Sequence, residues 1–245
     1  MKALVRILAG CLAVIAMISC TGNAPGPMAG ASNATAPPTD YRQLATQAGR
    51  VYALDPGVSR IRIYAFRGGR VASAGHNHVL TANVFTGFAY LPAAKLADAR
   101  FDLSFPLDKL VVDDPAMRKD AGPAFATELD AAAIKGTREH MLGLDNLDAA
   151  HFPDVSIHCV SVAGELPHAV ATVAVTLHGQ MRQQLVPLVV TLDAARLRIN
   201  GAFALRQSDF GITPYSIMGG LLTVQDEVAI EFELIGVPAS FDAPR

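Results

Sequence analysis

Tryptophan is absent from the 245 residues, and charged residues make up only 17% of the chain. Without tryptophan, the chain lacks the bulkiest side chain that could fill a narrow protein interior. The 20 Lys and Arg residues are balanced by 22 Asp and Glu, which leaves a formal net charge of −2. This balance excludes the basic face that nucleic-acid binding requires. A hydrophobic content of 51% is ample for a folded core in one or two domains.

The first 20 residues have the pattern of a secretion signal. Lys2 and Arg6 precede an apolar run over 8–18, which is too short to span a bilayer comfortably. The run ends in Met-Ile-Ser-Cys at 17–20, which resembles the lipobox of bacterial lipoproteins, where the signal is cut before a cysteine that then takes acyl chains. We therefore expect a signal peptide over 1–20 and lipidation of Cys20. A signal cleaved elsewhere, which leaves a soluble periplasmic protein, is the alternative.

Cysteine is scarce, and its placement agrees with export without disulfides. If Cys11 is removed with the signal and Cys20 is acylated, Cys159 has no partner, and we interpret it as a small buried hydrophobe on a strand. The residues after Cys20 are rich in Pro, Gly, Ala, Ser and Thr, which is typical of a flexible tether. We predict a tether and arm over 21–50, a folded domain over 51–237 and a tail over 238–245, in a periplasmic protein anchored to the membrane at its N-terminus.

Alternation of apolar and polar residues is the strongest structural signal in the chain. It is clearest over 222–234, where every second residue is apolar, and it recurs over 196–206. Such strands bury one face and leave the other in water, as antiparallel sheets do. The same criterion predicts the other strands, at 59–67, 79–90, 99–111, 155–162, 169–177 and 184–192. Eight antiparallel strands of this spacing close into a barrel or pack as a sandwich.

The period changes between residues 113 and 153, which indicates a helical insertion. The segment 123–134 is rich in Ala, Glu and Leu, and Thr137 is a candidate N-cap for a second short helix. Asp113 and Asp114, which precede Pro115, are interpreted as a solvated helix start. Pro106 has no backbone N–H, so it favours an edge or a bend in the strand predicted over 99–111.

Five local patterns occur in an order that identifies a family. They are YALDP at 52–56, GHNH at 75–78, LDAAHFP at 147–153, TLHG at 176–179 and SDFGI at 208–212. Together they resemble the YceI-like family of bacterial periplasmic proteins. The resemblance implies a mainly β protein, an eight-stranded antiparallel lipocalin-like β-barrel with a short helical insertion. It also implies a polyisoprenoid or similar long-chain lipid as the partner, held in an apolar tunnel, and, because related barrels often pair, a homodimer as one candidate assembly.

An eight-stranded barrel can either fill itself with side chains or hold one small ligand. Small residues at inward positions, such as Ala65 and Gly201, favour a hollow barrel, and a solid core without ligand is the alternative. We expect a bound lipid and no other cofactor, with the loop over 210–220 as a lid. The candidate tunnel and lid residues are Phe101, Leu103, Phe105, Phe203, Leu205, Phe210, Tyr215 and Phe232.

Polar candidates cluster where strands meet loops. His76 and His78 are two residues apart, so on a strand both rings would point to one side, as in a pair of metal ligands. For the two histidines, hydrogen bonding at the barrel mouth or to a ligand head group is the favoured role. Arg206 is a third candidate for the polar mouth, although pinning the turn with Asp209 is its favoured role. A metal-binding or stress-related module that uses His76 and His78 is the alternative function. A non-binding structural envelope lipoprotein is a third. The sequence holds no nucleophile elbow, phosphate loop, dinucleotide fingerprint or HExxH motif, so we do not expect an enzyme.

Overall fold

The computed structural model describes residues 39–193 and 196–241. The expected signal peptide, Cys20 and the tether up to residue 38 lie outside the described residues, as do residues 242–245 of the expected tail. Within the described ranges, no helix has both the length and the apolar character needed to cross a membrane.

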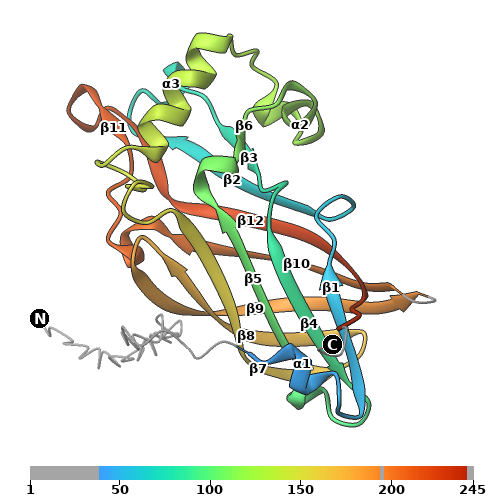
Figure 1. The fold of residues 1–245 in the computed structure, drawn as a ribbon. Helices are drawn as coiled ribbons and strands as arrows, with labels where there is room; N and C mark the ends of the chain where they lie inside the picture. Colours follow the sequence, from blue (N-terminus) through green and yellow to red (C-terminus); the bar gives the residue numbers. More distant parts are fainter. Residues whose placement is uncertain (1–38, 194–195, 242–245) are drawn as a thin grey trace, which may run out of the picture.

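Eight strands form one closed antiparallel cycle (Figure 1). The first, β1 (Gly49–Leu54), pairs with β4 on one edge and with β12 on the other, and this double pairing closes the barrel. The remaining strands are β4 (Thr86–Pro92), β5 (Arg100–Pro106), β7 (Asp154–Glu165), β8 (His168–Leu177), β9 (Gln180–Asp193), β10 (Arg196–Arg206) and β12 (Leu222–Pro238). The predicted eight-stranded antiparallel lipocalin-like barrel is confirmed.

The long strand β12 makes the two ends of the barrel different. Its final residues, 236–238, pair with β1, but its earlier residues, 223–233, pair with β2 (Arg60–Gly68). The sheet continues from β2 to β3 (His78–Thr81) and β6 (Val111–Val112), so it is wider at this end than at the end closed by β1. A short strand, β11 (Ser216–Ile217), pairs with the beginning of β12.

The helices α2 (Pro115–Asp120) and α3 (Ala131–Leu142) and the strand β11 lie toward the wide end, and α1 (Tyr41–Leu44) lies near the opposite end (Figure 1). One continuous apolar core is formed by buried side chains of the barrel. A small second cluster, centred on Tyr41, Val51 and Tyr90, packs α1 against the barrel. Short 3₁₀ turns make the connections: η1 (Ala72–Ala74), η2 (Leu96–Asp98), η3 (Leu107–Lys109), η4 (Pro123–Phe125), η5 (Gln207–Phe210) and η6 (Met218–Gly220).

Several strand predictions differ from the structure in their bounds. The strand predicted over 79–90 is two strands, β3 and β4, separated by residues 82–85. The strand predicted over 99–111 ends at Pro106 and gives way to η3, because proline cannot donate the next ladder hydrogen bond. β1 begins at Gly49, two residues before the expected start of the folded domain at 51, in a part of the chain where no strand was predicted. Cys159 is buried on β7 as expected, and burial raises the pKa of its thiol.

The helical insertion is capped differently from the prediction. Thr137 lies inside α3, and the N-cap is Asp130, whose side chain accepts a hydrogen bond from the Ala133 N–H. Asp114 caps α2 by accepting hydrogen bonds from two N–H groups of its first turn, as a helix start requires. The interpretation of its neighbour Asp113 as solvated is wrong, because that side chain is completely buried.

Candidate ligand cavity

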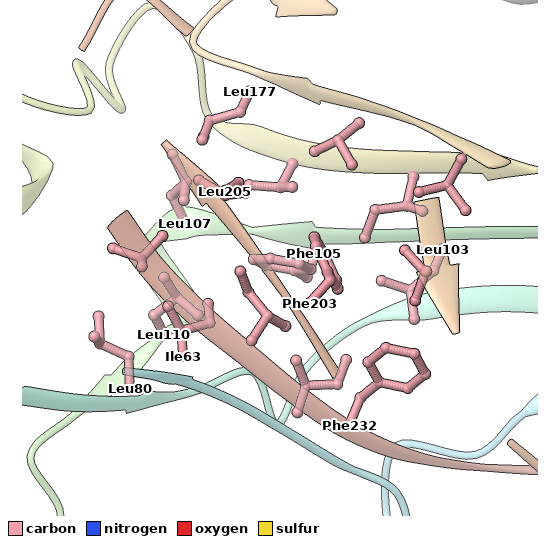
Figure 2. A pocket seen from close by; sticks show the side chains of 18 of the residues that line it. Ile63, Leu80, Leu103, Phe105, Leu107, Leu110, Leu177, Phe203, Leu205 and Phe232 are labelled. Carbon is pink, nitrogen blue, oxygen red and sulfur yellow. The ribbon is translucent and has the colours of Figure 1, made fainter. Parts of the chain in front are cut away.

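The inward faces of the strands enclose a cavity of about 190 Å³. Period-two alternation places its wall: on β10, for example, Ile199, Phe203 and Leu205 face inward, whereas Ala202 and Ala204 face out. Figure 2 shows side chains from β2, β3, β5, β8, β10 and β12 directed into this common space. The barrel is therefore hollow at least in part.

The cavity is lined along most of the length of β10. Its lining on β10 and the turn that follows extends from Ile199 to Gln207. Eight residue steps at a rise of about 3.3 Å correspond to roughly 26 Å. Such a shape suits an extended chain better than a compact ring system.

The wall of the cavity is almost entirely apolar. Of the 29 described residues that line it, 27 are apolar, and the other two are Asn146 and Gln207. No charged side chain is among them. Binding in such a space comes from removing apolar surface from water, at about 0.8 kcal/mol for each buried methylene before ordering costs.

The insertion and the loop after β10 close the wide end of the cavity. Leu107 and Leu110 reach it from η3 and its C-cap, Met141 and Leu147 reach it from the insertion, and Ile212 reaches it from the loop. The two segments contact each other directly: Asn146 Nδ2 donates a hydrogen bond of 3.2 Å to the Thr213 carbonyl, and the rings of His140 and Tyr215 lie 4.7 Å apart. Elements distant in sequence thus form one cap.

The Gln207 side chain is the more deeply buried of the two polar groups, with a residue exposure of 8%. Its Nε2 donates a hydrogen bond of 2.9 Å to the Gln225 carbonyl on β12. The sequence analysis missed this residue, although a signal for it exists: the inward series 199, 201, 203, 205 continues to 207 with the same period. A polar residue at an inward position is unusual enough to mark a site.

Six of the eight tunnel and lid candidates line the cavity: Phe101, Leu103, Phe105, Phe203, Leu205 and Phe232. The other two do not. Phe210 is fully buried in the core beside the cavity, and Tyr215 is 37% exposed on the outer side of the cap. The loop over 210–220 therefore has a packed first part and an exposed second part.

None of the three polar mouth candidates lines the cavity. Arg206 is exposed and donates from Nε to Glu227 at 3.1 Å, on the outer face of the barrel. Strand β3 begins at His78, so His76 precedes it and the alternation argument does not apply to the pair. His78 Nδ1 lies 2.6 Å from Asp113 Oδ2.

Asp113 is the centre of a buried ionic cluster beside the cavity. Its Oδ1 accepts hydrogen bonds from Arg118 at 2.6 Å and from the Val79 N–H at 3.1 Å, and its Oδ2 contacts His78. Burial opposes ionisation, but the bonds from His78, Val79 and Arg118 outweigh it, so the pKa of Asp113 lies below its ordinary value of 3.8. The cluster fastens α2 to β3. No group of three or more His, Cys, Asp or Glu side chains in the described ranges is arranged to hold a metal ion.

Comparison with known proteins gives the family. The YceI-like domain model matches residues 52–235, which is most of the chain. The chain belongs to the YceI-like family. Proteins of this family are barrels known to bind hydrophobic ligands, and they are binding proteins rather than enzymes.

Solved structures support the fold. BcnA of Burkholderia cenocepacia superposes with a TM-score of 0.55 at 16% identity, over 74% of this chain and 98% of BcnA. A mutant YCEI protein of Campylobacter jejuni superposes with a TM-score of 0.50 at 11% identity, over 66% of this chain and 85% of that protein. No curated protein matches the sequence.

The motifs that carry the YceI-like resemblance build the framework around the cavity. In GHNH, Asn77 accepts from the Arg67 N–H and donates to the Ala124 carbonyl, which joins β2 to the insertion. In TLHG, His178 and Gly179 both have positive φ, as a two-residue hairpin turn between β8 and β9 requires. No polar residue of the five motifs lines the cavity.

Proposed function

We propose that this protein binds a long apolar chain, a polyisoprenoid or a similar lipid, inside its barrel. The observation that carries the proposal is the lining: 27 of the 29 described residues are apolar and none of them is charged, and the lining segment on β10 and the turn after it is roughly 26 Å long. A barrel filled by its own side chains would not contain such an apolar cavity. Membership of a family that binds hydrophobic ligands supports the same conclusion.

The test uses two alanines that differ only in the face they occupy. Ala65 lines the cavity from β2, whereas Ala204 is exposed on the outer face of β10. An indole at 65 would occupy ligand space, so Ala65→Trp should lower the amount of copurified lipid and Ala204→Trp should leave it unchanged. Lipid is extracted with solvent from gently purified protein and measured by mass spectrometry per mole of folded protein. Equal lipid in both variants, or no lipid in the wild type, would contradict the proposal.

We further propose that the protein works in the periplasm, attached to the membrane by an acylated Cys20. This rests on the sequence pattern at 17–20. Growth with a radioactive fatty acid should label the wild-type chain, and Cys20→Ser should abolish the label. Pairing into a homodimer stays a prediction, which sedimentation analysis tests. The absence of catalytic activity in this chain also stays a prediction, which substrate screening tests.

A further inference from the structure

The two polar residues of the cavity present the same chemical group to it. Asn146 and Gln207 both lie at the wide end, where the insertion meets the loop after β10. The two are connected through that loop, since the Ile212 N–H donates to the Gln207 carbonyl and Thr213 follows directly. A ligand chain lying along the barrel would therefore place one of its ends beside them.

The hydrogen bonds fix how each side-chain amide is oriented. A backbone carbonyl can only accept, so the group that faces Gln225 O must be the NH₂ of Gln207, and the group that faces Thr213 O must be the NH₂ of Asn146. Each side-chain oxygen is therefore on the side away from its backbone partner. The assignment follows from chemistry and does not depend on telling oxygen from nitrogen.

The oxygen of Gln207 differs from its NH₂ group in having no partner among the described residues. In the described ranges, no residue donates a hydrogen bond to its Oε1. Among these residues the one fully enclosed and unpaired side-chain oxygen is Thr81 Oγ1, so Oε1 keeps access to open space. Because the side chain lines the cavity and is more than nine-tenths buried, that space is the cavity. An acceptor that faces an apolar cavity makes no hydrogen bond to the protein there, and a bound ligand that supplies a donor gives it one.

We infer that the bound chain ends in an uncharged head that carries a hydroxyl group, which donates a hydrogen bond to Gln207 Oε1 with Asn146 beside it. This deepens the proposed function and rests on it. A phosphate or carboxylate head is disfavoured here, because no cationic side chain among the described residues lines the cavity to offset the loss of the anion's hydration. An ester or a ketone head also lacks the donor. The ligand class is therefore a long-chain alcohol, including phenols.

The inference is tested with one isoprenoid chain that carries four different heads: the alcohol, its acetate ester, its monophosphate and the parent hydrocarbon. Affinities are measured by displacement of an uncharged fluorescent fatty-alcohol probe from lipid-stripped full-length protein. The wild type should bind the alcohol about three- to tenfold more tightly than the ester, the range expected for one hydrogen bond. Gln207→Met keeps the side-chain length and removes the acceptor, so it should reduce that preference to about onefold.

Controls separate the possible failures. Gln183→Met, on the exposed face of β9, should keep the wild-type preference. If Gln207→Met does not fold, Asn146→Leu in the half-buried cap loop and the wild-type ligand series still test the assignment. Binding of all four heads with equal affinity, or tightest binding of the monophosphate, would overturn the head assignment and leave lipid binding intact. Failure of every chain to displace the probe would instead contradict the proposed function itself.

Discussion

Replacement of Asp113 by Asn should destabilise the protein by removing one charge from a buried ion pair. The Asp113 side chain is fully buried, and that of its partner Arg118 is 6% exposed. Asn has the same shape and tolerates the positive φ of 54° found at this position, so the substitution changes charge without adding backbone strain. What remains is a guanidinium in a low-dielectric site without its counter-ion.

The cost follows from the contacts that Arg118 keeps. Breaking a buried pair costs about 3–5 kcal/mol, and we expect the lower end because Arg118 still donates to the carbonyls of Asn77 and Thr127. In a chain of this size a loss of about 3 kcal/mol lowers the melting temperature by roughly 6–12 °C.

Thermal unfolding followed by circular dichroism measures the change. Asp108→Asn is the matched control, because Asp108 is exposed and its partner Lys109 is exposed too, so its melting temperature should stay within about 2 °C of the wild type. A shift for Asp113→Asn no larger than that of the control would refute the reasoning.

The same carboxylate gives a pH dependence with a defined sign. The pKa of Asp113 is lower in the folded chain than its ordinary value of 3.8. Its contribution to stability is therefore complete above about pH 4 and is lost as the pH falls below 3.8 through the folded pKa. Melting temperatures of the wild type and Asp113→Asn should converge over that acid range and stay apart at neutral pH.

Two further substitutions test the framework. Tyr41 donates a hydrogen bond of 2.6 Å to Asp102, and burial followed by this carboxylate raises the pKa of the phenol, so Tyr41→Phe should cost about 1 kcal/mol and, by limited proteolysis, expose α1. Gly179→Ala should destabilise by about 1–2 kcal/mol in urea unfolding, because φ is +68° and a Cβ would lie 2.6 Å from the Phe152 ring. Gly136→Ala, in α3 with open space around it, should instead stabilise by about 0.5–1 kcal/mol, and the same sign at both glycines would contradict this account.

Local patterns predicted those parts of the fold that depend on local chemistry. Alternation located β2, β7, β8, β10 and β12, because residues at every second position of each of these strands line the interior of the barrel. The alternation did not predict β1 as a strand. β1 is held in the sheet by pairing with β4 and with the C-terminal end of β12, and neither partner is near it in the sequence. The N-cap prediction at Thr137 is wrong because the start of the helix before it was misplaced. That helix was expected to begin at 123, but residues 123–125 form η4 instead.

The same distinction between local and long-range contacts explains which residues of the candidate site were predicted. Phe101, Phe105 and Phe203 were predicted because inward positions on a strand follow from its period. His78 and Asp113 were misread, since the contact between them joins β3 to a segment 35 residues later and no sequence pattern reports it. Gln207 was within reach of the alternation but lies one step past the end of β10, where the strand pattern was no longer followed.

The family motifs and the cavity wall answer different questions about this protein. Polar motif residues such as Asn77 and His178 hold turns and join the insertion to the barrel, so any member that keeps them should keep the barrel. They do not face the ligand space, and so they carry no information about the ligand's head. That information lies in residues outside the motifs. Gln207 directly precedes SDFGI, and Gln207→Met should remove the preference for the alcohol head and, within the barrel, one hydrogen bond, that from Nε2 to the Gln225 carbonyl.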